Sequence, residues 1–376
     1  MRLLFFIFFL LHQNLISQSG FGPPSSPTYT NVESSIPQGY YSQAEGKSGT
    51  DLKESIHQII ANHNVFPYTS SNTDTWDILQ LSDQDPLNDE NMILVYTERS
   101  QDKLYRDGSG NYTSFENGNG TQNNSWNREH IWPKSHGFPD QDDIAYTDVH
   151  NLKPADRSVN TSRGTKDYDF GGQQHAEAIN CLFDSDSWEA PNSVKGDIAR
   201  IIFYMVVRYD PGYDHQNNIF DLELVDYTTA GNTNPIFGKL SSLIQWHYSD
   251  PVDDFEKNRN EVIFGFQGNR NPFIDYPSLV SFIWGENIDQ QWSQSLNIFS
   301  NLNSDFIIYP NPSSGTVRFN KELNSVRVSI YSMKGNLLIS DAHILNNSLQ
   351  LDLPPSPYIL KLDSDQGVFI KKIIIQ

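Results

Sequence analysis

The sequence predicts an α+β protein made of two folded parts, a mixed α and β domain over residues 40–293 and a small all-β sandwich over residues 305–376. Length is the first reason, because 376 residues exceed one typical domain and a hydrophobic fraction of 37% suffices for cores. The second reason is the polar stretch SQSLNIFSNLNSD after Trp292, which predicts a linker, placed here at residues 294–304. Third, the apolar residues follow helical spacing before this stretch and alternate after it.

The first 39 residues are expected to belong to neither domain. Arg2 is followed by the apolar run Leu3–Leu11 and then by small polar residues, which is typical of a secretory signal peptide over residues 1–19. This run is shorter than the roughly 20 apolar residues of a spanning helix, and no later run is longer, so no membrane span is expected. Residues 20–39 are rich in Pro, Ser and Gly and predict a flexible leader.

Within the mixed domain, hydrophobic spacing predicts the main elements. Leu52–His63 is expected to be a helix and Met92–Tyr96 a short buried strand. The stretch Asp107–Trp126 is crowded with Gly and Asn and predicts a long loop. Gly196–Tyr209 has the length and spacing of a buried helix, and Leu240–His247 suggests another. Beyond the linker, alternating segments predict four strands of the sandwich: 326–331, 349–353, 358–362 and 368–375.

The formal net charge of −20 argues against a nucleic-acid ligand, because phosphate binding usually requires a basic surface. The charge is unevenly spread, however. Residues 127–166 contain six basic and six acidic side chains, so this window is neutral within an acidic chain. The window is either a chance fluctuation or a groove that tolerates phosphate while acidity elsewhere keeps the protein soluble.

The single cysteine, Cys181, cannot form a disulfide within the chain. A secreted protein without disulfides must be held together by core packing. We therefore expect Cys181 to be a buried structural residue rather than a reactive thiol.

Two neighbouring segments carry the residues that suggest chemistry, NREHIWPKSHGFP at 127–139 and DVHNLKPADRSVNTSR at 148–163. Pro154 is suited to the first turn of a helix and Gly164 to its end, so residues 155–163 are expected to be a short helix. Lys153 is a poor N-cap, and Asn151 is an alternative one. Four residues of this helix share one face and could bind metal and phosphate: Asp156, Arg157, Asn160 and Arg163.

Glu129 and His130 are adjacent, and in a regular strand adjacent side chains point to opposite faces. They can share one site only where the strand bends or ends, and Pro133 gives a reason for such an end. One interpretation makes Glu129 an oxygen ligand for Mg²⁺ and His130 the base that deprotonates water. The alternative is an ordinary solvated pair on the surface.

The segments REHIWPKSHG, DVHNLKPADRSVNTSRG, GDIARIIFYMVVRY and RNEVIFGFQGNRNPFIDYP resemble the bacterial endonuclease I family, over roughly residues 40–276. The resemblance implies a ββα-metal site in which Glu129 and Asn160 hold one divalent ion, Mg²⁺ with Ca²⁺ or Mn²⁺ as alternatives, and His130 is the general base. It also implies cleavage of DNA and RNA to 5′-phosphate products. Contacts to backbone phosphates rather than base edges would make sequence preference weak.

The chain departs from the family pattern in two ways, in its lack of disulfides and in one functional role. Relatives carry disulfides and a phosphate-stabilising arginine between the Glu-His pair and the Asp-x-His-Asn-Leu segment, an interval without arginine here. The candidates for this role are Arg128, Arg157, Arg163, Arg259, Arg270 and Lys134. The residues expected to support the site by hydrogen bonds in the turn before the helix are Asp148, His150 and Asn151.

Other assignments compete for the same residues. His130, His136 and His150 could form a zinc triad, but the sequence has no helical His-Glu-x-x-His pattern. Three aromatic residues could stack on bases, although core packing is the expected role: Trp126, Trp132 and Tyr146. Functionally, the rivals to a nuclease are a zinc hydrolase and a non-catalytic secreted binding protein.

The C-terminal segments FIIYPNPSSG, YSMKGNLL, YILKL and GVFIKKIIIQ resemble the sorting domain recognised by the type IX secretion system. The resemblance implies that the secretion machinery is a partner and that the protein is extracellular, either free or attached to the cell surface. The alternative is a β-sandwich adhesion module.

Overall fold

The computed structural model of the chain describes most of its length. The described residues are 29–111, 113–117, 120–210, 214–215, 218–229, 231, 233–294, 308–320, 327–332, 336–342, 344, 347–364 and 367–376. The predicted signal peptide, residues 20–28 of the predicted leader and nearly all of the predicted linker lie outside these residues. The chain forms two compact units, one built on residues up to Asn287 and the other on residues from Ile288 onward, which takes in Ala44–Ser48.

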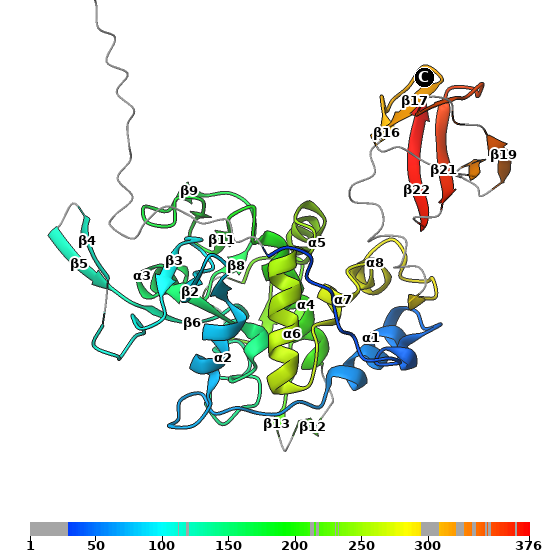
Figure 1. The fold of residues 1–376 in the computed structure, drawn as a ribbon. Helices are drawn as coiled ribbons and strands as arrows, with labels where there is room; N and C mark the ends of the chain where they lie inside the picture. The colour runs from blue at the N-terminus through cyan, green and yellow to red at the C-terminus, as the bar shows by residue number, and fades with distance from the viewer. Residues whose placement is uncertain are drawn as a thin grey trace, which may run out of the picture. The chain divides into compact units, whose positions relative to one another are not determined.

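Mixed helices and strands build the first unit (Figure 1), which confirms the predicted class. Its α-helices are α1 (Gly49–Ile60), α2 (Thr75–Ser82), α3 (Arg157–Arg163), α4 (Lys195–Arg208), α5 (Leu240–Ser249), α6 (Asp254–Gln267), α7 (Pro272–Asp275) and α8 (Leu279–Trp284). Helix α4 is buried along its whole length, and α1, α5 and α7 contact it. Three of the predicted helices are thus present as α1, α4 and α5, with ends shifted by one to three residues.

The strands of the first unit are short and form several small sheets. Those near the site are β1 (Gln84–Asp85), β2 (Asn88–Ile93), β3 (Ser100–Asp102), β4 (Thr113–Asn117), β5 (Gly120–Asn124), β6 (Trp126–His130) and β7 (Leu152–Asp156). The others are β8 (Asp167–Tyr168), β9 (Gln173–Gln174), β10 (Leu182–Phe183), β11 (Ser187–Glu189), β12 (Asp214–His215), β13 (Asn218–Ile219), β14 (Glu223–Leu224) and β15 (Ile236–Phe237).

Three expected elements differ from the structure. Strand β2 ends at Ile93, and the apolar residues after it form a buried turn, in which Glu98 N–H donates to the Leu94 carbonyl at 2.8 Å. The apolar run indicated burial, which a turn satisfies as well as a strand does. The expected loop 107–126 contains the antiparallel hairpin β4–β5, since strand pairing tolerates polar residues. Pro154 lies in β7 rather than in the helix, which begins at Arg157.

The second unit is an all-β sandwich, as expected (Figure 1). One sheet has the order β16-β17-β20 and the other β19-β18-β21-β22. The strands are β16 (Ile308–Tyr309), β17 (Thr316–Phe319), β18 (Arg327–Ser332), β19 (Leu337–Ala342), β20 (Ser348–Gln350), β21 (Ser356–Ser364) and β22 (Gly367–Ile375). Alternate residues of both sheets meet in one apolar core, which includes Val317, Ile330 and Leu360.

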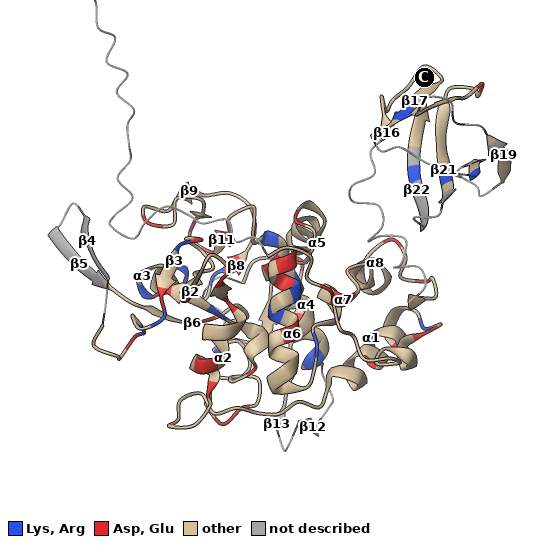
Figure 2. Cartoon of the chain, in the orientation of Figure 1, with Lys and Arg blue, Asp and Glu red and all other residues tan. Residues whose placement is uncertain are grey.

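The expectation for the single cysteine agrees with the structure. Cys181 is a buried free thiol that contacts the Tyr96 carbonyl at 3.4 Å, so it is a structural residue. None of the described helices combines the length and apolar character needed to cross a membrane. Charged residues of both signs are interspersed in the first unit, and α6 carries both (Figure 2).

Candidate functional site

Strands β6 and β7 and helix α3 form a ββα unit at the two motif segments. The strands pair antiparallel, with Glu129 opposite Lys153 and His130 opposite Leu152. Three contacts join α3 to the chain at β6: Arg157 N–H to the Ser125 carbonyl (2.9 Å), Asn160 Nδ2 to Asn127 Oδ1 (2.9 Å) and Arg163 Nη1 to Glu129 Oε1 (3.2 Å). Positions 125, 127 and 129 share one face of an extended chain. Helix α3 therefore covers the face of β6 that carries Glu129.

The Glu129 carboxylate is buried at this junction. Its Oε1 accepts a hydrogen bond from the Tyr96 hydroxyl at 2.6 Å and forms the ion pair with Arg163. Among the described residues, no donor reaches its Oε2. Burial raises the pKa of Glu129 above its ordinary value, although Arg163 and the Tyr96 hydrogen bond act in the opposite direction. A cation close to Oε2 would therefore stabilise the ionised form.

Asn160 presents a second oxygen on the same face of β6. Its amide nitrogen donates to Asn127 Oδ1 at 2.9 Å and weakly to the Arg128 carbonyl at 3.4 Å. These bonds orient the amide, and its Oδ1 has no donor among the described residues. A carboxylate oxygen and an amide oxygen are hard ligands of the kind that Mg²⁺ and Ca²⁺ prefer. The donor set therefore fits such an ion, with the remaining positions left to water and substrate.

His130 is the last residue of β6, at the strand end where the two motif residues could meet. Its Nε2 lies 2.9 Å from the Tyr146 carbonyl, so this nitrogen carries the proton and Nδ1 is the free acceptor. The ring stacks on Tyr68 and meets the edge of Tyr146. Burial lowers the pKa of His130 to about 3, which keeps the imidazole neutral at physiological pH.

Three of the five candidate arginines belong to the two motif segments, and their surroundings differ. Arg128 is buried, with its guanidinium 3.2 Å from the centre of the Tyr68 ring and donating to Thr75 Oγ1 at 2.7 Å. Arg163 is fully buried and also donates to the carbonyls of His130 and Ile131. Arg157 is exposed and makes an ion pair with Asp107 at 3.2 Å.

The other cationic candidates divide in the same way. Arg259 and Arg270 are buried and paired with carboxylates, with Arg259 Nε 3.1 Å from Asp83 Oδ1. Lys134 is exposed, and its ammonium donates to the Tyr146 hydroxyl at 2.6 Å. Because the Tyr146 ring meets the His130 ring at a centroid distance of 4.8 Å, Lys134 is an exposed cation close to His130.

The residues expected to support the site are all buried, and each bonds across the turn. Asp148 accepts from the hydroxyls of Tyr204 and Tyr209, at 2.7 and 2.9 Å. Burial alone would raise the pKa of Asp148, but neighbouring positive groups and hydrogen bonds lower it to about 2. His150 Nε2 lies 3.3 Å from the Asn269 carbonyl, and burial lowers the pKa of His150 to about 3. Asn151 ties the turn to the chain after β6, because its side chain bonds both backbone groups of Trp132.

Three tyrosines complete the surroundings of the motif pair. Tyr96 donates a hydrogen bond to Glu129, and Tyr68 stacks on the His130 ring. Tyr146 contacts His130 through its carbonyl and its ring. Tyr146 stood out in the sequence only as an aromatic residue. Tyr96 and Tyr68 lie far from the motifs along the chain, and no local pattern distinguishes them. Among the described residues, no group of three His, Cys, Asp or Glu side chains is placed to hold a metal, so the histidines do not form a zinc triad there.

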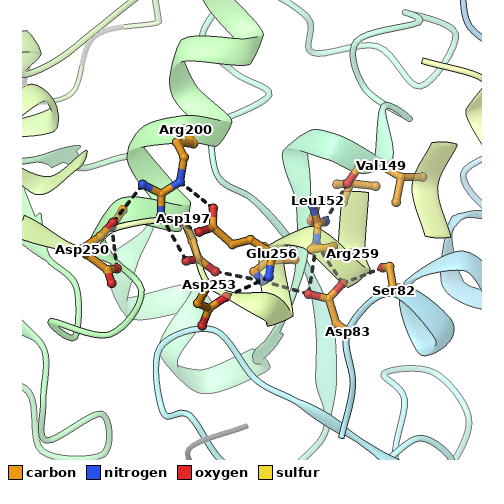
Figure 3. A network of polar contacts seen from close by, with 12 residues as sticks. Ser82, Asp83, Val149, Leu152, Asp197, Arg200, Asp250, Asp253, Glu256 and Arg259 are labelled. Carbon is orange, nitrogen blue, oxygen red and sulfur yellow. Dashed lines mark hydrogen bonds and ion pairs between the residues drawn. The ribbon is translucent and has the colours of Figure 1, made fainter. Parts of the chain in front are cut away.

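A buried network of charges holds β7 and the turn before it (Figure 3). Arg259 Nη2 donates to the Val149 carbonyl at 2.8 Å and also to the Leu152 carbonyl, while its Nε pairs with Asp83. Lys153 pairs with the same carboxylate at 2.9 Å. The second half of the network joins α4 to α6 through Arg200 and Glu256.

Comparison with known proteins relates both units to described families. A family model described as endonuclease I matches residues 48–278, and one described as secretion system C-terminal sorting domain matches residues 307–376. The extracellular ribonuclease of Bacillus subtilis (strain 168) is 45% identical over 248 residues, 65% of this chain and 78% of that protein. The extracellular ribonuclease of Bacillus amyloliquefaciens is 42% identical over 262 residues, 69% of this chain and 83% of its own length. The extracellular deoxyribonuclease of Aeromonas hydrophila is 30% identical over 148 residues, 38% of this chain and 55% of that protein.

Proposed function

The chain belongs to the endonuclease I family and ends in a type IX sorting domain, and on this basis we propose that it is a secreted endonuclease that cleaves both DNA and RNA. Cleavage uses His130 as general base and one divalent ion, and it leaves 5′-phosphate ends. The observation that carries the proposal is the state of His130, a neutral imidazole with its proton on Nε2 and its Nδ1 free, in the residue next to Glu129.

The metal ligands in this proposal are Glu129 and Asn160. This assignment is supported by Glu129 Oε2 and Asn160 Oδ1, which accept no hydrogen bond from the described residues. Both oxygens lie on the face of β6 that α3 covers. Family members are generally dependent on divalent metals. When bound, a divalent ion such as Mg²⁺ neutralises negative charge that develops on the phosphate oxygens. Tyr96 and Arg163 position the carboxylate, since both bind its other oxygen.

In the reaction, His130 Nδ1 takes a proton from a water molecule as the water oxygen attacks phosphorus. The bond from phosphorus to the 3′ oxygen breaks, and the leaving oxygen takes a proton from a second water molecule, so the products are a 5′-phosphate and a 3′-hydroxyl. The Tyr146 carbonyl accepts from His130 Nε2 and so stabilises the imidazolium that forms. Lys134 is the exposed cation nearest to this ring by its contacts, and we assign it to the phosphate that is cut.

The substrate range follows from the nucleophile. Because water attacks, the reaction requires no 2′-hydroxyl, so DNA and RNA can both be substrates. The names of the relatives agree with this breadth, since two are extracellular ribonucleases and one is an extracellular deoxyribonuclease. Contacts to backbone phosphates make sequence preference weak.

Metal removal tests the proposal. We expect plasmid DNA and a structured RNA to be degraded by the purified protein, and both activities to disappear with a chelator because the phosphate charge is no longer neutralised. Mg²⁺, Ca²⁺ and Mn²⁺ are then added back separately, with Zn²⁺ as the comparison. Activity that survives chelation, or that only Zn²⁺ restores, would contradict the assignment of Glu129 and Asn160.

We assign catalysis to the first unit and secretion to the sorting domain, and this assignment leads to a separate prediction. A chain ending at Ser293 should keep its nuclease activity but remain in the cell envelope, because all assigned site residues precede this position and the sorting domain follows it. Activity is measured in the medium and in the envelope fraction of cells expressing each form. A truncated chain that is folded by circular dichroism but inactive would place part of the site in the sorting domain.

A further inference from the structure

The exposed ion pair between Arg157 and Asp107 lies beside the proposed metal ligand. Arg157 is three residues before Asn160, so the two are separated by one helical turn, a rise of about 4.5 Å. Its guanidinium bonds Asp107 Oδ1 at 3.2 Å, and the two side chains are 51% and 40% exposed. Among the described residues of the first unit, the remaining arginines are buried, apart from the partly buried Arg106, whose guanidinium lies over the Trp76 ring. Arg157 is thus the arginine that solvent, and therefore substrate, can reach.

The ion pair borders a hollow with a volume of about 420 Å³. The residues that line it are Asp107, Gly108, Gly110, Asn111, Asn124, Ser125 and Arg157. Both glycines have φ near +80°, a conformation that favours glycine and leaves the loop without side chains there. None of the described residues that line it has an apolar side chain, so it suits a sugar-phosphate chain better than a hydrophobic ligand.

Arg157 can exchange Asp107 for a phosphate with little loss of protein stability. An exposed ion pair of this kind adds little to stability, because water and salt screen both charges. A phosphate diester offers the guanidinium two oxygens in the paired geometry that arginine prefers. Asp107 forms no other side-chain hydrogen bond among the described residues, and its backbone N–H is held separately by the Trp126 carbonyl at 2.8 Å. The carboxylate can therefore release Arg157 without disturbing the loop.

We propose that Arg157 binds a backbone phosphate next to the one that is cut, and that Asp107 occupies Arg157 until substrate displaces it. The proposal rests on the proposed function for the position of the cleaved phosphate. Arg157 is then a phosphate-binding subsite on an acidic protein, and the Asp107 carboxylate lowers its affinity for phosphate by competing for the guanidinium. Asp107 is then a residue that limits substrate affinity, and Arg157 a residue that binds substrate without taking part in proton transfer.

Equilibrium binding separates this subsite from the chemistry. The full-length protein is titrated into fluorescein-labelled single-stranded DNA and RNA 12-mers with a chelator present, so that no cleavage occurs, and the Kd is measured by anisotropy over a series of salt concentrations. Arg157→Ala should raise the Kd about fivefold on both strands and lower the slope of log Kd against log salt by about one. Asp107→Asn should lower the Kd about two- to threefold, since it releases Arg157 from a competing partner.

The double variant and a matched control decide between a subsite and a general charge effect. Asp107→Asn should have no effect in the Arg157→Ala background, because it acts only through Arg157. Asp254→Asn removes the same charge from a partly exposed ion pair elsewhere on this unit, with Lys257 at 2.8 Å, and should leave the Kd unchanged. The proposal is overturned if Arg157→Ala binds with the wild-type Kd and salt slope, or if Asp107→Asn strengthens binding equally without Arg157. Failure of the proposed function gives a different result. In that case His130→Ala keeps the wild-type turnover, while the Kd values of the Arg157 and Asp107 variants for the labelled strands still change as expected.

Discussion

His130→Ala should lower turnover by about 10²- to 10⁴-fold, the usual contribution of a positioned base, while the affinity for Mg²⁺ is retained. The variant removes the nitrogen that accepts the proton but leaves Glu129 and Asn160 in place. Turnover on DNA and Mg²⁺ binding by calorimetry are measured on the same preparation, and added imidazole should restore part of the rate. His136→Ala is the matched control, because His136 is also buried and lies six residues further along the chain, but its ring contacts the Ile236 carbonyl instead of the Tyr146 carbonyl. Wild-type turnover in His130→Ala would place the base elsewhere, with His150 as the next candidate.

The metal ligands should give the opposite pattern. Glu129→Gln or Asn160→Ala is expected to weaken Mg²⁺ binding, and high Mg²⁺ should recover part of the activity. Glutamine is preferred to alanine at position 129, because its amide oxygen can still accept hydrogen bonds from Arg163 and the Tyr96 hydroxyl, whereas alanine would leave both buried donors without this acceptor. Unchanged Mg²⁺ affinity in Glu129→Gln would show that this carboxylate does not hold the ion.

Glu256→Ala should destabilise the nuclease unit by about 3–5 kcal/mol, because it removes the carboxylate that binds the buried guanidinium of Arg200 directly and leaves it only the longer pair with Asp197 at 3.9 Å. Glu256 accepts two bonds from Arg200, at 2.6 and 2.5 Å, and both side chains are buried (Figure 3). For a domain of this size, such a loss lowers the melting temperature by about 10 °C. The midpoint of the first unit is measured by calorimetry on the full chain.

Two further variants identify the cause of this loss. Lys257→Ala breaks the neighbouring exposed pair with Asp254 and should change stability by about 0.5 kcal/mol or less. Arg200→Met combined with Glu256→Leu removes both charges and should recover much of the stability. If the double variant is no more stable than Glu256→Ala, the loss comes from packing or from the other bonds of Arg200, such as the one to the Asp250 carbonyl at 2.9 Å.

Local patterns in the sequence were sufficient for the two-part organisation and for most of the helices. The spacing and length of the apolar residues in the segment that forms α4 were sufficient to predict a buried helix. The family motifs lie close together along the chain, so their residues alone identified Glu129, His130 and Asn160 as candidates. The apolar run after β2 and the polar hairpin β4–β5 were misassigned, because strand formation depends on pairing partners that the local sequence does not specify.

The roles of the arginines, in contrast, depend on tertiary packing. Arg157 and Arg163 lie on one short helix, and their spacing places them on the same face with Asn160. Yet Arg163 is enclosed, with Tyr168 and Phe237 beside its guanidinium, whereas Arg157 faces solvent. A short helix, its shared face and the chemistry available on that face all follow from the local sequence. Which end of the face is buried depends on side chains supplied by distant segments, and burial decides whether an arginine holds a carboxylate inside the protein or remains free to bind phosphate.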